Sequence, residues 1–245
     1  KTMNYDIILC SLNSKYVHSS LAPWYLFTAI KKDLPKIKAA VFESTINEKS
    51  DKIIDELLKY KSKIYAFSCY IWNFLKVLEI AKKIKEEDES ATILFGGPEV
   101  SYNSNAVLND YPFVDYIICG EGEEPICKFL TEFFNNTCKY DIKGLSYKGN
   151  ISKEFISDKE PVSPYCDEYF DSLSGRIAYI ETTRGCPFNC AFCLSGRCGG
   201  VRFFNLEKVF SDIIKLANSG TRTIKFVDRT FNANSERANK ILRFI

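Results

Sequence analysis

Short apolar segments alternate with amphipathic helical segments through the first half of this chain, and that alternation limits the folds it can adopt. Each apolar run is followed by a polar or glycine-containing loop and then by helical periodicity. Such alternation is typical of α/β proteins, in which helices cover both faces of a parallel sheet. We therefore predict a doubly wound parallel sheet of five βα units. The predicted strands are residues 5–9, 37–42, 64–68, 92–95 and 114–119, and the predicted helices are residues 21–34, 53–58, 72–87 and one ending near residue 134.

Two of these helices carry further local signals. Ser19 or Ser20 can cap the first helix, and Pro23 is tolerated in its first turn. The helix at residues 72–87 is amphipathic, which predicts one apolar face against the sheet. The residues predicted on that face are Leu75, Leu78 and Ile84.

The loops after the predicted strands indicate a ligand site. In parallel sheets the carboxyl ends of the strands meet at one edge, and ligands bind there. Glycines at this edge allow a ligand to approach the backbone closely, although they can also serve only to make tight turns. The fingerprint G-x-G-x-x-G is absent after the first strand, so a dinucleotide is not expected. The candidate residues in these loops are Gly96, Gly97, Pro98, Gly120, Glu121 and Gly122.

Three closely spaced cysteines mark the second half of the chain. Cys186, Cys190 and Cys193 have the spacing C-x3-C-x2-C in a loop that also contains glycine and proline. Grouped thiolates are preferred ligands of iron–sulfur clusters and of zinc. Three thiolates on a 4Fe-4S cluster would leave one iron open for a small molecule. Cys198 follows soon after, so a closed zinc site with four cysteine ligands is the alternative.

The chain divides into three predicted regions. Residues 1–135 form the α/β domain, and residues 136–175 form a small hairpin near 145–152 with an extended linker. Residues 176–245 read strand (176–181), cysteine loop, helix (205–218), strand (223–228) and a further helix after Asn234. A complete βα barrel needs about 200 residues or more, so we expect only the truncated start of one, in a fragment that is inactive by itself.

Composition excludes several classes of protein. The net charge of +2, with acidic and basic residues interleaved, gives no basic patch for nucleic acid, and no apolar run is long enough to span a membrane. The ten cysteines occur in a long, lysine-rich chain without a signal peptide, which favours a reducing cytoplasm over a disulfide-rich secreted scaffold.

The cysteine motif resembles that of the radical S-adenosylmethionine (SAM) enzymes, with Phe192 as the aromatic residue before the last cysteine. An α/β domain ahead of it, with Gly-Gly-Pro and Gly-Glu-Gly-Glu loops, is similar to the cobalamin-binding radical SAM group. That group includes anaerobic magnesium-protoporphyrin IX monomethyl ester cyclases and several methyltransferases. The resemblance implies a Rossmann-like cobalamin-binding domain, a 4Fe-4S cluster that cleaves SAM reductively, and radical methylation, cyclisation or oxidation of an unactivated carbon. It also implies a small-molecule substrate and an electron donor such as flavodoxin or ferredoxin.

The same resemblance assigns further residues. Ser68, Gly96 and Gly97 would line the nucleotide tail of cobalamin. Other cobalamin proteins carry D-x-H-x-x-G after the first strand, whereas this chain begins that stretch at Asn13 and has Lys15 in the place of the cobalt-binding histidine. We therefore expect cobalamin without a protein nitrogen below the metal.

For several other side chains the sequence allows both a functional and a structural role. The only histidine, His18, lies three residues after Lys15 and either lines the rim or packs as an ordinary residue. Tyr16 and Tyr70 are candidates for shielding the lower face of cobalt, or are core aromatics. Asp228, in a stretch that resembles the V-D-x-T-F variant, is the candidate for contacting SAM; its alternative role is to cap the following helix or turn.

Two alternative functions remain from the sequence. A methylthiotransferase also has an α/β domain before its radical SAM motif, and that domain binds a second cluster; Cys10, Cys69 and Cys119 end predicted strands here. A non-catalytic zinc-binding module is the other alternative.

Overall fold

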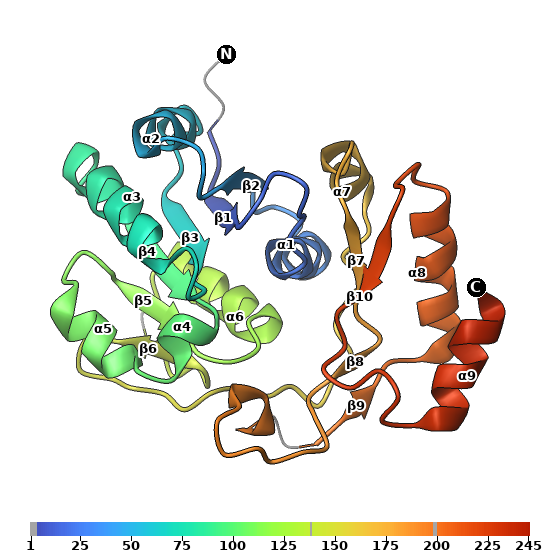
Figure 1. Ribbon diagram of the computed structural model, residues 1–245. Helices are drawn as coiled ribbons and strands as arrows, with labels where there is room; N and C mark the ends of the chain where they lie inside the picture. The colour runs from blue at the N-terminus through green and yellow to red at the C-terminus, as the bar shows by residue number, and fades with distance from the viewer. Residues whose placement is uncertain (1–3, 138, 198–199) are drawn as a thin grey trace. The chain divides into compact units, whose positions relative to one another are not determined.

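A computed structural model describes residues 4–137, 139–197 and 200–245 of the chain, which form two compact units (Figure 1). The first unit comprises Lys1–Tyr16 and Ser20–Pro164. The second unit comprises Tyr165–Ile245 together with the short segment Val17–Ser19. Each unit is described by itself below.

The first unit is built on a six-stranded sheet with the strand order β2-β1-β3-β4-β5-β6. The first five strands are parallel, and β6 pairs antiparallel with β5 at one edge. The predicted doubly wound parallel sheet is therefore confirmed, with an additional antiparallel edge strand. The strands are β1 (Ile7–Asn13), β2 (Ala39–Thr45), β3 (Ile64–Ser68), β4 (Thr92–Gly96), β5 (Tyr116–Ile118) and β6 (Leu145–Tyr147).

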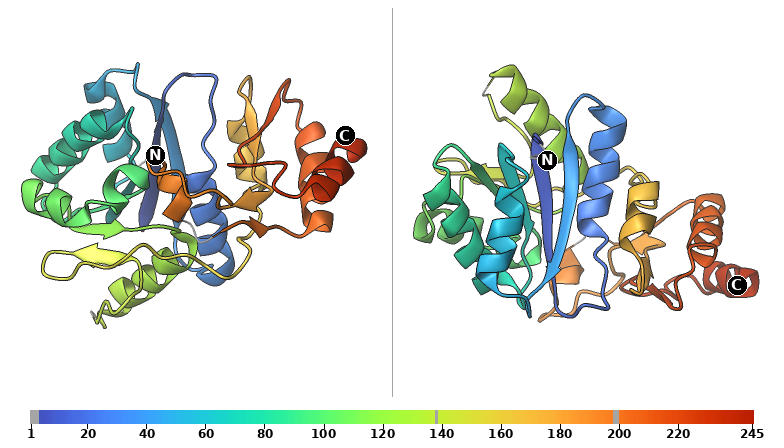
Figure 2. Two further views of the ribbon diagram at one scale, coloured as in Figure 1. Left: turned by 60° about the horizontal axis from the view of Figure 1, so that its bottom comes forward. Right: turned by 90° about the horizontal axis from the view of Figure 1, so that it is seen from above.

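Helices cover both faces of this sheet (Figures 1 and 2). Helices α1 (Ala22–Asp33) and α6 (Glu123–Asn135) lie on one face, and α2 (Ser50–Leu58) and α3 (Phe74–Glu87) lie on the other. Two short helices, α4 (Pro98–Ser101) and α5 (Ser104–Asp110), connect β4 to β5. Strands β1, β3 and β4 are buried along most of their length, which is expected for central strands of a parallel sheet.

Two helix predictions are wrong in detail. Leu75 lies in the first turn of α3 with an exposed fraction of 81%, and the buried face instead carries Val77, Leu78, Ile80, Ala81 and Ile84. No serine caps α1: the residue before it is Leu21, which makes no side-chain cap, although Pro23 does lie in the first turn.

Two strand predictions also change. Strand β1 was expected at residues 5–9 but begins at Ile7 and continues to Asn13, because the polar residues after Cys10 are buried as well. The predicted hairpin is present as a bridge between Tyr147 and Asn150, but its first arm also joins the main sheet as β6. Local turn signals do not reveal that long-range pairing.

The second unit contains two small pairs of strands, three α-helices and one short 3-10 helix, η1, among its described residues. Strand β7 pairs parallel with β10, and β8 pairs antiparallel with β9. The segment predicted as an extended linker before residue 176 contains helix α7, which Cys166 precedes. The elements are α7 (Asp167–Ser172), β7 (Ala178–Ile180), β8 (Thr183–Arg184), η1 (Leu194–Arg197), β9 (Arg202–Phe203), α8 (Leu206–Ala217), β10 (Ile224–Phe226) and α9 (Ser235–Phe244).

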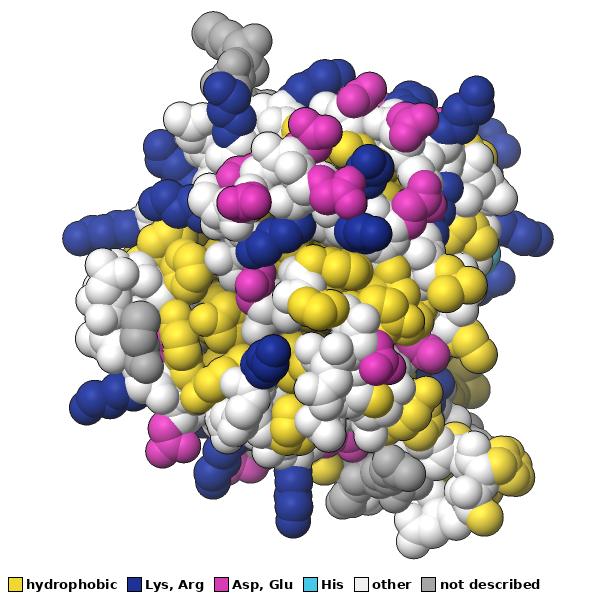
Figure 3. All heavy atoms as spheres, turned by 90° about the vertical axis from the view of Figure 1, so that its left-hand side faces the viewer, with side chains coloured by type: hydrophobic (Ala, Val, Ile, Leu, Met, Phe, Trp, Pro, Cys, Tyr) yellow, Lys and Arg dark blue, Asp and Glu magenta, His cyan; other side chains and the backbone are white. Residues whose placement is uncertain are grey.

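The visible surface agrees with the charge balance of the sequence. Figure 3 shows acidic and basic side chains intermixed on one face, with hydrophobic side chains between them. Among the helices that the structure describes, none has the length and apolar character needed to cross a membrane.

Candidate functional site

The carboxyl ends of β1, β3, β4 and β5, with the loops that follow them, form what we call the carboxyl rim of the first unit. Asn73, a buried residue just before α3, connects two of these ends. Its side-chain amide donates hydrogen bonds to the carbonyl oxygens of Leu12 (3.1 Å) and Ser68 (2.9 Å), and its oxygen accepts one from the Tyr70 amide (2.8 Å). Asn73 was not predicted from the sequence as a site residue. The pattern that could have indicated it is an asparagine at the start of a predicted helix.

Glu43 on β2 fixes the loop between β1 and α1. Its carboxylate accepts hydrogen bonds from the Asn13 side chain (3.2 Å), the Ser20 backbone amide (2.9 Å) and the Trp24 indole (3.2 Å). Asn13, predicted to bind a cofactor, is thus buried and bonded to Glu43. Lys15, further along the same loop, is exposed. Glu43 was also not predicted as a site residue, although an acidic residue at the end of an apolar strand segment could have indicated it.

The Gly-Gly-Pro loop after β4 contains two glycines in different surroundings. Gly97 has φ +104°, and a Cβ there would lie 2.5 Å from the carbonyl oxygen of Cys69. A Cβ on Gly96 would meet only the Ile118 carbonyl oxygen, at 3.6 Å, which is an ordinary contact. Pro98 begins α4 and is exposed. Gly97 is therefore required by the fold of its own loop, whereas Gly96 has space beside it.

The Gly-Glu-Gly loop after β5 is packed against another part of the same unit. The Phe155 amide donates to the Cys119 carbonyl (2.9 Å), and the Glu121 amide donates to the Phe155 carbonyl (2.9 Å). Gly120 has φ +88°, and a Cβ there would overlap the backbone of Phe155. A Cβ on Gly122 would lie 3.0 Å from a methyl group of Leu26. These two glycines accommodate chain packing, which is the structural alternative left open by the sequence.

Two carboxylates of this loop and helix also bind the neighbouring segment. Ser157 donates through its backbone amide to Glu121 (3.3 Å) and through its hydroxyl to Glu124 (2.5 Å). Lys159 forms an ion pair with Glu124 (3.3 Å). The hydrogen bond from the Ser157 hydroxyl is the largest cause that lowers the pKa of Glu124, and the hydrogen bond from Lys159 lowers it further.

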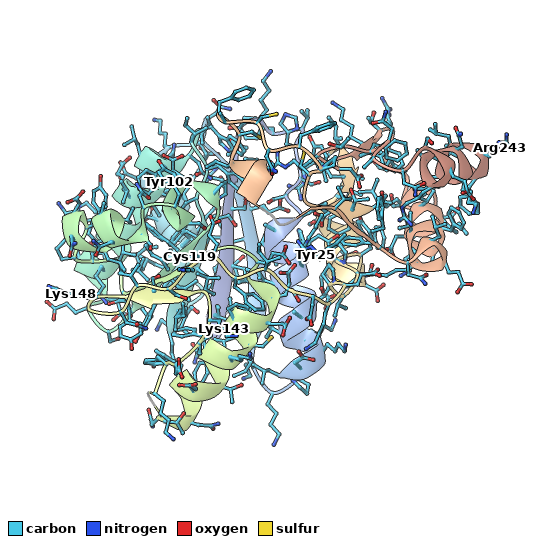
Figure 4. The ribbon with its side chains drawn as sticks, turned by 90° about the horizontal axis from the view of Figure 1, so that it is seen from below. Tyr25, Tyr102, Cys119, Lys143, Lys148 and Arg243 are labelled. Carbon is cyan, nitrogen blue, oxygen red and sulfur yellow. The ribbon has the colours of Figure 1, made fainter. Side chains whose placement is uncertain are left out.

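Exposed apolar side chains lie in the loop after β3, and single ones lie in the segments that follow α4 and β1. Tyr70 and Trp72 stack with ring centroids 4.5 Å apart and planes 8° apart. Ile71, between them, has an exposed fraction of 82%. Tyr102, labelled in Figure 4, follows α4 and is half exposed, and Tyr16 is exposed as well. The stacked rings of Tyr70 and Trp72 present a flat apolar surface suitable for a planar ligand.

The three cysteines at the strand ends of the first unit do not form a metal site. Cys10, Cys69 and Cys119 are buried within the hydrophobic core, where Cys119 is labelled in Figure 4. Burial raises the pKa of all three thiols, which disfavours the thiolates that bind metals. Their surroundings therefore argue against the second cluster that the methylthiotransferase alternative requires.

The cysteine loop of the second unit, residues 185–201, is closed at its base by the pairing of β8 with β9. The Cys186 sulfur lies 3.5 Å from the Thr230 hydroxyl, and Cys190 and Cys193 are exposed on a turn. Phe192 has an exposed fraction of 93%. No three potential metal ligands of the described residues are grouped closely enough to hold an ion. Cys198, the fourth ligand of the zinc alternative, lies outside those residues.

Asp228, at the end of β10, contacts the residues that lead into the cysteine loop. Its Oδ1 accepts hydrogen bonds from the Thr182 amide (3.0 Å), the Thr182 hydroxyl (2.8 Å) and the Thr183 hydroxyl (2.6 Å). Its Oδ2 is buried and has no hydrogen-bond partner in the described part of the chain. A buried carboxylate oxygen in this state is a suitable acceptor for a cationic group.

His18 belongs to the second unit. Its ring nitrogen Nδ1 shares a short hydrogen bond of 2.5 Å with the hydroxyl of Tyr179 on β7, whose pKa is raised by burial. The adjacent Val17 carbonyl accepts a hydrogen bond from the Ile177 amide (2.7 Å), and the Ser19 hydroxyl donates to the Ile177 carbonyl (2.7 Å). The segment Val17–Ser19 therefore lies beside the strand that leads to the cysteine loop.

Comparison with protein families identifies the class of the first unit. Residues 11–130 match the family described as the B12 binding domain, a range that contains the sheet from β1 to β5 and the loops of the carboxyl rim. Residues 11–130 of the first unit are thus similar to the B12 binding domain family.

Similarity extends beyond that domain. The chain is 27% identical over 186 residues to 2-(S-pantetheinyl)-carbapenam-3-carboxylate methyltransferase of Streptantibioticus cattleyicolor, covering 69% of this chain and 27% of that protein. It is 25% identical over 185 residues to the anaerobic magnesium-protoporphyrin IX monomethyl ester cyclase of Cereibacter sphaeroides, covering 69% and 30% of the two chains. The chain thus spans about a third or less of the length of these relatives.

A solved structure matches almost the whole chain. The cobalamin-dependent SAM radical enzyme OxsB, with aqua-cobalamin and SAM bound, superposes with a TM-score of 0.79 at 19% identity, over 98% of this chain and 36% of that one. The chain is therefore similar in sequence to a cobalamin-dependent radical SAM methyltransferase and similar in fold to OxsB.

Proposed function

We propose that this chain is the cobalamin-binding domain and the cluster-binding start of the barrel of a radical SAM enzyme. The observation that carries the proposal is the order of its two parts. A B12-binding unit with a rim of strand-end loops precedes a unit in which β7 and β8 lead directly into a three-cysteine loop. We assign residues 1–135 to the first part, 136–175 to the connection and 176–245 to the second.

In this proposal the carboxyl rim binds cobalamin around Ser68 and Gly96. These two residues are register partners at the ends of β3 and β4, Ser68 is partly exposed, and Gly96 has space beside it. The stacked pair of Tyr70 and Trp72 offers an apolar surface to a corrin ring. Gly97, Gly120 and Gly122 shape the backbone around that site, Pro98 starts the helix beside it, and Lys15 and Glu121 are polar groups at its edge.

Cys186, Cys190 and Cys193 would bind a 4Fe-4S cluster in the second unit. Cys190 and Cys193 are exposed on a turn whose conformation three iron ligands would fix, and thiolates are the ligands that such clusters require. Phe192, which lies between Cys190 and Cys193 in the sequence and is exposed, would cover the cluster. Asp228 Oδ2 is the proposed acceptor for the amino group of SAM. The cluster and SAM would supply reductive cleavage to a carbon radical, and cobalamin would supply methyl or radical transfer.

The wider proposal concerns substrate and setting. Because the relatives named above act on small organic molecules, we propose radical methylation, cyclisation or oxidation of an unactivated carbon in a small molecule. The cluster would receive its electron from flavodoxin or ferredoxin. Oxygen-sensitive thiol ligands require a reducing compartment, so we propose a cytoplasmic location.

Anaerobic reconstitution with iron, sulfide and hydroxocobalamin tests this function. We expect about four irons per chain and bound cobalt that remains after gel filtration. Replacing the cysteines together (Cys186→Ala, Cys190→Ala and Cys193→Ala) should remove the iron and leave the cobalt. Gly96→Val should do the reverse, because a branched side chain would fill the space beside the backbone.

Other outcomes would overturn the proposal in separate parts. If the protein binds iron but no cobalt, the chain has a radical SAM site and its carboxyl rim does not bind cobalamin. Zinc without sulfide in the wild-type chain would favour the four-cysteine zinc module. Loss of both cofactors in each variant would show that the effects come from misfolding and not from two independent sites.

A further inference from the structure

The residues just before the cysteine loop are more buried than two of the cysteines within it. Thr182 and Thr183 are almost completely buried, with exposed fractions of 1% and 2%, whereas Cys190 and Cys193 are exposed. The Thr182 carbonyl accepts hydrogen bonds from the Phe204 amide (3.0 Å) and from Arg237 (3.2 Å). The base of the loop is therefore a fixed support for a more open set of ligands.

One oxygen of Asp228 provides the central part of this support. Three donors from Thr182 and Thr183 converge on Oδ1 at 2.6–3.0 Å. A carboxylate accepts but does not donate, and its hydrogen bonds are roughly twice as strong as those between neutral groups. A residue needed only to contact a ligand would not require three such bonds to the neighbouring strand.

The loop that carries Asp228 also touches the first cysteine. Thr230 lies two residues after Asp228, and its hydroxyl is 3.5 Å from the Cys186 sulfur. The loop after β10 therefore contacts the chain on both sides of Gly185, whose φ of +90° marks a sharp turn there. Fixing Thr182 and Thr183 against Asp228 thus fixes where the Cys186 sulfur lies.

We propose that Asp228 is a positioning residue for the cysteine loop. Its Oδ1 clamps Thr182 and Thr183 and so sets the place of the Cys186 sulfur, while its buried Oδ2 remains for a cationic ligand. This role deepens the proposed function, on which it rests for the nature of the bound cluster. It replaces the idea that Asp228 acts only by capping a helix: α9 is capped by Asn234 instead.

The clamp is first tested in cluster-free protein by hydrogen–deuterium exchange of the peptide at residues 181–186. The test variant is Thr182→Val with Thr183→Val, which removes two donors and leaves Asp228 intact. The control is Thr221→Val, which removes a partly buried hydrogen bond from the Thr221 hydroxyl to the Arg176 carbonyl in the same unit. We expect exchange at residues 181–186 to be at least roughly tenfold faster in the test variant, because it loses two hydrogen bonds, and unchanged in the control.

The second readout is the release of iron from reconstituted protein to a chelator. The double valine variant and Asp228→Ala should release iron roughly tenfold faster than wild type. Asp228→Asn should release it more slowly than Asp228→Ala, because its amide oxygen still accepts hydrogen bonds. Unchanged exchange and unchanged iron release in the double valine variant would overturn the inference, as would an Asp228→Asn variant that loses only SAM affinity.

These readouts separate the inference from the proposed function. If the wild-type chain binds no iron, the proposed function fails, and the exchange experiment still decides whether the clamp exists. Circular dichroism shows whether Asp228→Ala folds; if it does not, the double valine variant alone decides the question.

Discussion

Gly97→Ala is expected to destabilise the first unit strongly, although it adds only one methyl group. Gly97 has φ +104° and ψ 171°, a region that is almost confined to glycine and costs other residues about 1–3 kcal/mol. The new Cβ would lie 2.5 Å from the Cys69 carbonyl oxygen, and relieving such an overlap in a packed region costs about 1–3 kcal/mol more. The expected loss in the free energy of unfolding is therefore about 2–6 kcal/mol.

Urea unfolding followed by tryptophan fluorescence measures this loss selectively. The chain has two tryptophans, Trp24 and Trp72, and both lie in the first unit. With a slope of about 2 kcal/mol per molar urea, the midpoint should fall by about 1–3 M. Gly96→Ala is the matched control and should shift it by less than about 0.5 M, since its Cβ meets one atom at 3.6 Å. Equal shifts in the two variants would refute the assignment of Gly97 to the fold of its loop.

Two further predictions concern ionisable groups of the described residues. The pKa of Glu124 is lowered in the folded protein, so its carboxylate stabilises the first unit at pH values above the ordinary pKa of 4.5, and this contribution is lost as the pH falls through the folded-state pKa. Ser157→Ala removes the main cause of the lowered pKa and should therefore make the free energy of unfolding in urea depend less on pH in this acidic range. A pH profile identical to that of the wild type would contradict the assignment. In anaerobic, cluster-free protein, iodoacetamide should modify the exposed Cys190 and Cys193 long before the buried Cys10 and Cys69, as followed by mass spectrometry; early modification of Cys69 would contradict its burial.

Local sequence signals were sufficient for the sheet and for most of its helices. Strand β3 has the predicted bounds, because a short apolar run between polar turns leaves little choice of register. Leu75 was wrongly predicted to be buried. Helical spacing predicts which face of the helix a residue lies on, but it does not predict whether the first turn of that helix is covered by other parts of the protein. The antiparallel pairing of β6 depends on a contact with β5 that no local pattern encodes.

The polar residues that organise the two candidate sites were harder to predict. Asn73, Glu43 and Asp228 each make several hydrogen bonds, at least one of them to a segment distant in sequence. Asparagine, glutamate and aspartate are common residues, and only the folded structure shows how many hydrogen bonds converge on each of these three side chains. For Asp228 the sequence motif did indicate an important position, but the alternatives it offered did not include a clamp on Thr182 and Thr183.

The contrast among the rim glycines bears on where specificity for a cofactor can arise. A glycine that faces a ligand and a glycine that lets two backbone segments pass look alike in sequence, but a Cβ would meet different atoms in each case. At Gly97 and Gly120 it would meet the protein backbone, so substitution there should reduce stability whether or not cobalamin binds. At Gly96 it would meet little of the protein, so substitution with a larger residue should reduce cobalamin affinity at nearly constant stability. Measuring both quantities for both kinds of glycine therefore separates the residues that build the rim from those that contact what it binds.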